Sequence, residues 1–170
     1  MLKANSKYRL TDEIIKMAYG RTLYRIEAVK SFGNVKKGDR GGFVEDLHNL
    51  SEDGTSWIYN NAMVYEGACI KDDSIVCDTA TVRGNAIVCG ISGVYNNSLI
   101  CDSAIIRNKS VIYGCKIYGN AIVEYSSLGG VEIGGDAYLD NVDINGPICI
   151  TGDAQISRNY KFDYELIQEV

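Results

Sequence analysis

Ten Val or Ile residues stand six apart without interruption in the middle of the chain. Two residues before each of them is an Ala or a Ser, so that every hexad contributes one aliphatic and one small side chain. A six-residue period of this kind is typical of a parallel β-helix, in which each hexad forms one short strand and one corner of a coil. The aliphatic positions are Ile58, Val64, Ile70, Val76, Val82, Val88, Val94, Ile100, Ile106 and Ile112, and the small positions are Ser56, Ala62, Ala68, Ser74, Ala80, Ala86, Ser92, Ser98, Ala104 and Ser110.

The ladder continues beyond Ile112 with a spacing of five or six residues. Eighteen aliphatic positions at three per turn predict six coils, and a strand spacing of ~4.8 Å gives a rod of roughly 29 Å. Val76, Val94 and Ile112 are then expected to lie directly above one another. Gly, Asn or Asp recurs after the early positions and suits the left-handed backbone of tight corners. The later inward candidates are Ile117, Val123, Leu128, Ile133, Leu139, Ile144, Ile150 and Ile156.

The segments that flank the ladder are expected to cover its ends, because an open end of a β-helix is an exposed strand edge. Residues 14–19 and 22–29 are separated by Gly20 and Arg21 and predict a β-hairpin. The glycines of the pairs 38–39 and 41–42 predict turns.

The predicted fold class is therefore all-β: a single-stranded parallel β-helix of about six coils with an N-terminal β-hairpin cap. The predicted organisation is an N-terminal β cap at residues 1–50, a hexapeptide-repeat β-helix at residues 51–158 and a C-terminal tail at residues 159–170 that caps the last coil as a short helix or strand.

The composition gives no sign of a membrane or of an oxidising compartment. No apolar run approaches the ~20 residues of a membrane span, and the N-terminus lacks the hydrophobic core of a signal peptide, so that we expect a cytoplasmic protein. The cysteines have no C-x-x-C spacing, and we interpret them as small apolar residues rather than metal ligands or disulfides. No cofactor and no metal are expected. The cysteines are Cys69, Cys77, Cys89, Cys101, Cys115 and Cys149.

Charge divides the chain into a basic N-terminal part and an acidic remainder. Residues 1–50 hold ten Lys or Arg and six Asp or Glu, whereas residues 51–170 hold seven and sixteen. Residues 117–157 contain no Lys or Arg. Such a rod is typical either of a solvated surface or of one that binds a basic partner or imitates a polyanion. The carboxylates predicted to bind a partner are Glu124, Glu132, Asp136, Asp140, Asp143 and Asp153.

Two faces of the rod are expected to carry outward rows of apolar side chains. With three positions per turn, the residues beside the inward positions sort onto three faces, and long apolar rows rarely remain exposed in a monomer. Three alternatives follow. The N-terminal cap or the tail covers such a row, chains associate through it as a dimer or trimer, or a different protein binds there. A row of aromatics also suits a flat sheet for reasons of β-propensity alone. The interface candidates are Trp57, Tyr59, Cys69, Ile75, Ile87, Tyr95, Ile105, Tyr113, Ile122 and Tyr138.

A family of bacterial and phage hexapeptide-repeat proteins resembles this chain over roughly residues 24–153. The resemblance is carried by LYRIEAVKSFGNVKKGDRGGFVED, by SWIYNNAMVYEGA and by GNAIVCG, of which the first, with Val35-Lys36-Lys37-Gly38-Asp39 and Gly41-Gly42, is the most specific. These proteins belong to the LpxA-like superfamily of left-handed β-helices and are often labelled acyltransferases. The resemblance implies a left-handed coil and a phage or prophage origin. Several relatives continue into a further C-terminal domain, which we expect this chain to lack.

The acyltransferase hypothesis has one candidate catalytic residue. Hexapeptide acyltransferases typically use a His general base between subunits, and the only His here is His48, which precedes the first coil. A general base must come within hydrogen-bond distance of the proton that it removes, so His48 would have to project across a subunit interface. His48 is a weak catalytic candidate, and a carbonic-anhydrase site with three His ligands is excluded.

Three functions remain open. The favoured hypothesis is a non-enzymatic, phage-encoded protein that binds a basic host protein through the rigid acidic rod, for example an anti-CRISPR or other inhibitor of host defence that imitates nucleic acid or blocks a surface. The alternatives are an acyl-CoA-dependent acyltransferase acting as a homotrimer and an architectural oligomer. We expect no membrane association and no direct nucleic-acid binding, because the acidic rod would repel a duplex from the small basic patch of Lys36, Lys37 and Arg40.

Overall fold

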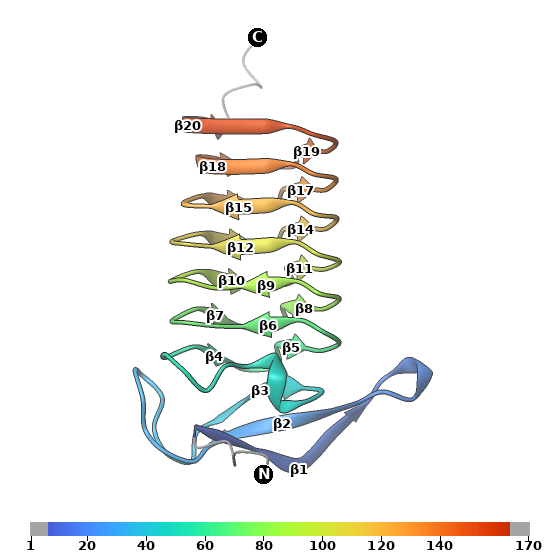
Figure 1. Ribbon diagram of the computed structural model, residues 1–170, viewed down its shortest axis with the longest axis vertical. Coiled ribbons are helices and arrows are strands. Elements are labelled where there is room, and N and C mark those ends of the chain that lie inside the picture. The colour runs from blue at the N-terminus through green and yellow to red at the C-terminus, as the bar shows by residue number, and fades with distance from the viewer. Residues whose placement is uncertain (1–6, 164–170) are drawn as a thin grey trace.

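The computed structural model describes residues 7–163, and side chains up to residue 157. Short parallel strands stack in triangular turns into a rod, and an antiparallel β-hairpin lies at its N-terminal end (Figure 1). The protein is therefore all-β apart from two short 3-10 helices, η1 (Ala18–Gly20) and η2 (Leu47–Asn49). The predicted parallel β-helix with a hairpin cap is confirmed.

The chain visits three faces in each turn of the rod. Face 1 is formed by β4 (Trp57–Ile58), β7 (Ile75–Val76), β10 (Gly93–Tyr95), β13 (Val111–Tyr113) and β16 (Ser127–Gly129). Face 2 is formed by β3 (Arg40–Val44), β5 (Met63–Val64), β8 (Thr81–Val82), β11 (Leu99–Ile100), β14 (Lys116–Ile117), β17 (Glu132–Ile133) and β19 (Cys149–Ile150). Face 3 is formed by β6 (Cys69–Ile70), β9 (Ile87–Val88), β12 (Ile105–Arg107) and β15 (Ile122–Glu124).

In the last two turns the chain passes from face 3 to face 1 within one long strand. Strand β18 (Tyr138–Asn145) runs from face 3 onto face 1, because residues 138–140 pair with β15 and residues 143–145 pair with β16. Strand β20 (Gln155–Asp163) then follows β18 in parallel register. The expected tail thus begins as a strand at residues 159–163, and residues 164–170 lie outside the described part of the chain.

The interior of the rod is the aliphatic ladder. Val94 pairs with Val76 on one side and with Ile112 on the other, and all three side chains are fully buried. The small residues fill the narrow space beside them, and the inward hydroxyls bond to backbone carbonyl oxygens. Ser98 Oγ donates to that of Tyr95 in its own turn at 2.7 Å, and Ser92 Oγ donates to that of Asn108 on the next turn at 3.1 Å. Because each fully buried Val or Ile contributes about 1.5–3 kcal/mol, stacking supplies the core that no single turn could form alone.

Corner residues keep the turns tight and also join them. The second residue after each inward position from Ile58 to Ile150 has a positive φ, for example 63° at Asp78 and 58° at Asn96. The Asp78 carboxylate accepts a hydrogen bond from the Asn60 side chain at 3.2 Å and one from the Asn96 backbone N–H at 2.9 Å. These residue types bear the left-handed backbone at low cost, and here their side chains also bridge three successive turns.

The rod has about seven turns, one more than the sequence indicated. Strand β3 pairs in parallel with β5, and Leu50 forms a parallel bridge with Ile70, so that these residues complete a first turn. The sequence holds a signal for this additional turn: Val44 and Leu50 stand six apart, and Leu50 precedes Ile58 by eight residues.

The hairpin extends the sheet of face 2. Strand β1 (Tyr8–Lys16) pairs antiparallel with β2 (Thr22–Ala28), and β2 pairs antiparallel with β3. Gly41 and Gly42, which were expected to mark a turn, lie inside β3 instead. A Cβ at Gly41 would stand 2.7 Å from the Ile58 carbonyl oxygen, and one at Gly42 would stand 2.4 Å from that of Ala62. Both glycines therefore serve the close approach of β3 to the first turn rather than a change of direction.

Candidate functional site

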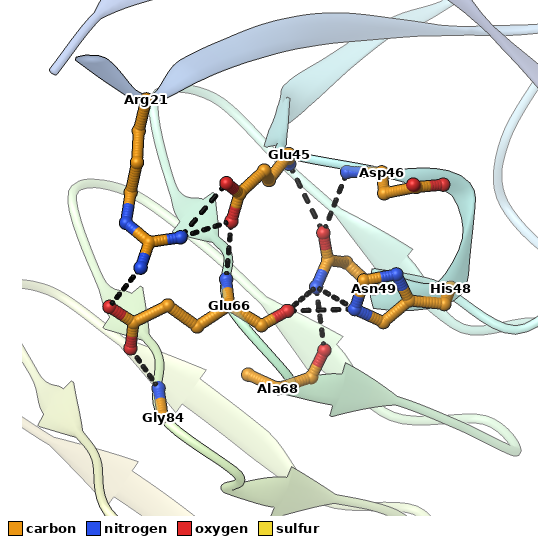
Figure 2. A network of polar contacts seen from close by, with 8 residues as sticks. All are labelled: Arg21, Glu45, Asp46, His48, Asn49, Glu66, Ala68 and Gly84. Atoms are coloured by element: carbon orange, nitrogen blue, oxygen red, sulfur yellow. Dashed lines mark hydrogen bonds and ion pairs between the residues drawn. The ribbon is translucent and has the colours of Figure 1, made fainter.

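The N-terminal residues 7–50 are called the head below. The catalytic candidate His48 lies where the head joins the rod, in a network that Figure 2 shows. Its Nε2 is 2.7 Å from the backbone carbonyl oxygen of Glu66. A carbonyl oxygen only accepts hydrogen bonds, so that this nitrogen carries the proton and donates. The neighbouring Asn49 is fully buried and also donates to the Glu66 and Ala68 carbonyl oxygens, at 3.0 and 2.8 Å. Both side chains thus fasten η2 to the second turn.

The same junction contains an ion-pair network that the sequence did not single out. Arg21 NH1 lies 2.9 Å from both carboxylate oxygens of Glu45, and its NH2 lies 3.1 Å from Glu66. The Glu66 carboxylate also accepts the backbone N–H of Gly84 at 2.7 Å (Figure 2). The hydrogen bonds and ion pairs drawn there are all made within the chain, and this arrangement joins the hairpin to two successive turns. It is the geometry of a structural junction.

Six carboxylates were predicted to bind a partner, and this prediction is corrected for Glu124. Its side chain is buried, with the residue 8% exposed, and it is bonded to Arg107 at 2.7 Å, to Asn108 at 2.6 Å and to the Tyr138 hydroxyl. The hydrogen bonds from Arg107 and then Tyr138 lower the pKa of this carboxyl, and the same contact raises the pKa of Tyr138. A carboxylate satisfied in this way is unsuited to a partner, and it ties together β12, β15 and β18.

The other five acidic residues stay near the surface but do not gather on one face. Glu132 on face 2 pairs with Lys116 at 2.8 Å, which lowers the pKa of its carboxyl. Asp136 and Asp153 lie on consecutive turns at the corner between faces 2 and 3, where the N–H of Asp136 donates to the carbonyl of Gly152. The two remaining residues, Asp140 on face 3 and Asp143 on face 1, belong to β18. The acidic side chains therefore surround the C-terminal part of the rod.

The interface candidates lie on two of the three faces of the rod. On face 3 each of the five candidates is in register with the next and is half-buried; these residues are Cys69, Ile87, Ile105, Ile122 and Tyr138. On face 1 the column before the inward positions starts with Trp57 and Ile75, and the column after them contains Tyr59, Tyr95 and Tyr113. That a partner covers either face stays a prediction.

Trp57 corrects the expectation of an exposed face 1 candidate. It is 1% exposed, because the head folds over the first turn and places Phe32 at 5.5 Å and Tyr8 at 6.3 Å between ring centroids, both edge to face. Farther along face 1, Tyr95 and Tyr113 stack on each other at 4.8 Å with an interplanar angle of 20°, and Tyr113 is 44% exposed. Face 1 is thus covered by its own chain at one end and open in the middle.

Two exposed apolar side chains beside face 1 escaped the sequence analysis. Ile91 and Tyr125, 61% and 55% exposed, lie at the corner that leads from face 3 onto face 1 and line a shallow hollow with Gly90, Asn108 and Lys109. Tyr125 has a φ of 51°, a conformation that costs a non-glycine residue roughly 1–2 kcal/mol. The signal in the sequence is a Tyr at a corner position where Gly, Asn or Asp usually stands.

Five of the six cysteines are half-buried or buried and behave as packing residues, whereas Cys149 is exposed. Burial raises the pKa of the Cys77 thiol to about 11 and also raises the pKa of Cys69, Cys89 and Cys101, so that these thiols are poor nucleophiles and ligands. Within residues 7–163 no group of three or more His, Cys, Asp or Glu side chains is arranged to hold a metal ion. The same part of the chain has no helix with the length and apolar character needed to span a membrane.

These features define the class of protein: a parallel β-solenoid built on hexads, with a hairpin head fastened to it by buried polar contacts. No protein-family model matches the chain, and no curated protein matches its sequence.

Proposed function

We propose that the protein is a non-enzymatic binding protein whose acidic C-terminal turns engage a protein with a basic surface. The observation that carries this proposal is the ring of surface carboxylates at Asp136, Asp140, Asp143 and Asp153. They lie within residues 117–157, a stretch that contains no Lys or Arg. Attraction between complementary charges speeds encounter and selects the partner. The solenoid holds these groups in place, which lowers the cost of ordering on binding.

The spacing of the carboxylates supports recognition by several basic groups together. Asp136 and Asp153 occupy the same corner on adjacent turns, which stack at ~4.8 Å. The Asp136 carboxylate is held by the Asn120 amide at 2.8 Å, so that its direction is fixed before a partner arrives. A rigid row of negative charge is also what a protein that imitates a nucleic acid would present.

We propose further that the chain is a left-handed, phage-encoded hexapeptide-repeat protein of the LpxA-like superfamily and that its partner is a host protein, as the motif around residues 35–42 implies. Inhibition of a host defence system, including anti-CRISPR activity, is the form of this proposal that suits an acidic, rigid surface. The location that follows is the cytoplasm of an infected or lysogenic bacterium.

Charge reversal tests the proposal. A variant with Asp136→Lys, Asp140→Lys and Asp153→Lys should recover no basic protein from host lysate, whereas the native chain should recover one whose binding weakens steeply with salt. Glu132 is left unchanged because its reversal would break the pair with Lys116. The control reverses the exposed Asp12 and Asp53 near the head and should bind as the native chain does. Equal binding by all three proteins would contradict the proposal.

The acyltransferase alternative depends on His48, whose Nε2 donates to a backbone carbonyl. It predicts that acetyl-CoA binds and that His48→Ala abolishes turnover without loss of the fold. Calorimetry that detects no heat on titration with acetyl-CoA would count against this alternative, and the third alternative, an architectural oligomer, would be dismissed by a monomer at all concentrations.

A further inference from the structure

Strand β1 is the open edge of the sheet on face 2. Among residues 7–163 it pairs only with β2, and the order β1-β2-β3 places it first in the nine-stranded sheet. In Figure 1 β1 lies farthest from the stacked turns, and the turn between β1 and β2 projects beyond the side of the rod. Such an edge presents a row of backbone N–H and C=O groups to which a further strand can bond.

The backbone groups that point outward near the end of β1 belong to its even-numbered residues. The Met17 N–H donates to the Arg21 carbonyl oxygen at 2.9 Å, and β1 keeps this register with β2 back to Ile14. In an antiparallel pair, residues that bond to the neighbouring strand alternate with residues that do not. Ile15 therefore bonds to β2, whereas Ile14 and Lys16 direct their N–H and C=O groups away from it.

A bulge shortens the part of this edge that can pair regularly. The register of β1 and β2 shifts between Leu10 and Ile14, so that three residues of β1 stand opposite Arg25 alone. Bulges of this kind interrupt the ladder and protect strand edges. The regular segment beyond the bulge runs from Ile14 to Lys16, next to the turn that projects beyond the rod. Ile14 is 44% exposed, so that an apolar side chain stands on this open segment.

The charged side chains of β1 divide into two that are paired within the chain and two that are not. Arg9 and Glu13 form ion pairs with residues of β2 or β3. None of the ion pairs between described side chains includes Asp12 or Lys16, which are exposed and of opposite sign. The Lys16 ammonium group donates to the Thr22 hydroxyl at 2.8 Å, and it has three N–H groups to donate.

We propose that this edge pairs in antiparallel fashion with the same edge of a second copy of the chain, with Ile14 opposite Ile14 on the two-fold axis. Asp12 and Lys16 stand two residues to either side of Ile14, so that Asp12 of each copy faces Lys16 of the other. This contact is made by side chains, and the bulge at Asp12 does not prevent it. The edge is thus self-complementary, as an isologous contact requires, and the sheet continues from one copy into the next.

The other pairings of the two edges are less favourable. A slip of one residue sets outward groups of one copy against inward groups of the other. A slip of two residues places Ile14 opposite Asp12 or Lys16, and a slip of four places Asp12 opposite Asp12 or Lys16 opposite Lys16. A parallel pair in register sets both like-charged pairs side by side. Because directly opposed like charges destabilise a sheet and opposite charges stabilise it, charge complementarity selects a single register.

The dimer joins two rods at their heads and leaves their other ends free. The turns that carry Asp136, Asp140 and Asp153 lie at the end of the rod opposite β1 (Figure 1). None of these groups takes part in the proposed contact, so that the inference does not depend on the proposed function. A dimer of this kind presents two acidic ends, and simultaneous engagement of both would increase the overall affinity for a partner with two basic sites.

The first experiment measures the mass of the purified protein by sedimentation equilibrium over a range of concentrations. The native chain should form a dimer. Asp12→Lys and Lys16→Asp each set like charges opposite each other twice and should raise the dimer dissociation constant roughly tenfold or more, whereas the double variant should return it to within about threefold of the native value. The matched control, Lys37→Asp, changes an exposed lysine of the head outside β1 and should dimerise as the native chain does.

Circular dichroism checks that each variant is folded. A native chain that is monomeric at every concentration would overturn the proposal, and so would single variants that dimerise as the native chain does. A double variant that associates as weakly as the single variants would overturn the register. The experiment uses this protein alone, so that its failure leaves the proposed basic partner untouched.

The second experiment tests the register through the residue on the axis. In a Cys149→Ser background, which removes the exposed native thiol, Ile14→Cys brings two thiols opposite each other at a Cα separation of about 5.5 Å, within the range of a disulfide. On oxidation this variant should form a covalent dimer roughly tenfold faster than Ile91→Cys, at a more exposed position on the rod. Equal rates for the two variants would contradict the pairing at Ile14.

Discussion

Face 1 contains two regions with the same backbone and opposite surroundings. In the first turn Trp57 is sealed beneath Phe32 and Tyr8, whereas two and three turns later Tyr95 and Tyr113 stack on each other. Both regions belong to the same stack of strands: Trp57 stands just before an inward position, and Tyr95 and Tyr113 stand just after one.

The difference teaches that this face is covered as far as the chain itself can reach. The head packs over one turn of face 1 and leaves the next turns bare, although their composition is as apolar. A contiguous apolar surface rimmed by polar groups is typical of an interface. The covered region therefore measures what a cover contributes to stability, and the open region shows the same face without a cover.

The largest expected effect is on the covered region. Trp57→Ala should lower the free energy of unfolding by about 4 kcal/mol, because it removes a fully buried indole and leaves a cavity between head and rod. Urea denaturation monitored by circular dichroism measures the change. Trp57→Phe, which retains a ring, should cost clearly less. A loss below about 1 kcal/mol would mean that the head is not packed firmly on face 1.

Lys7, beneath the same cover, gives a pH-dependent effect. Its ammonium group donates to the Ser51 carbonyl at 3.0 Å and to Ser56 Oγ at 3.2 Å, and burial lowers its pKa from 10.5 to about 8. Below pH 8 the lysine is charged in both the folded and the unfolded chain, and the cost of burying the charge is fully present. Between pH 8 and 10.5 the folded chain releases this proton first, so that its contribution to stability rises.

Comparison with Lys7→Met isolates that contribution from the titration of the Cys and Tyr residues. The difference in unfolding free energy should shift in favour of the native chain as the pH rises from 8 to 10.5, by on the order of 3 kcal/mol, since one pKa unit corresponds to about 1.4 kcal/mol. Urea denaturation at several pH values measures it. A difference that does not change with pH would show that Lys7 is solvated.

In the open region the effect on a single chain should be smaller. Tyr113→Ala, measured at a concentration low enough for monomers, should lower the free energy of unfolding by about 1 kcal/mol, the size of one aromatic contact at a partly exposed site. Thermal and urea unfolding at several protein concentrations separate this loss from the loss of any dimer. A cost as large as that of Trp57→Ala would contradict the contrast between the two regions.

The smallest effect should have the opposite sign. Tyr125→Asn is expected to stabilise the isolated chain by about 0.5 kcal/mol, because Asn tolerates the left-handed corner at lower cost and little apolar surface is lost. Tyr125→Phe, which keeps the ring and the strain, should leave stability unchanged, and its thermal midpoint serves as the reference.

Much of the fold could be read from the hexads, and the errors have a common cause. Trp57 was expected outside because its hexad position points outward, but Phe32 comes from a loop that no repeat describes. Glu124 was expected free, yet Arg107 lies one turn below it. Gly41 and Gly42 were expected in a turn, whereas a strand passes too close to the first coil for any Cβ. Each error concerns a contact between parts of the chain whose spacing the ladder does not determine.

The sequence by itself determined the stack, the register of Val76, Val94 and Ile112, and the sorting of outward residues onto three faces, because a period of six with one aliphatic residue per strand has a single way to bury its core. The tertiary structure alone decided which outward residues remain available. Covering Trp57, pairing Glu124 and engaging His48 with a carbonyl all require groups from a different turn or from the head, and only the folded chain brings those groups within contact distance.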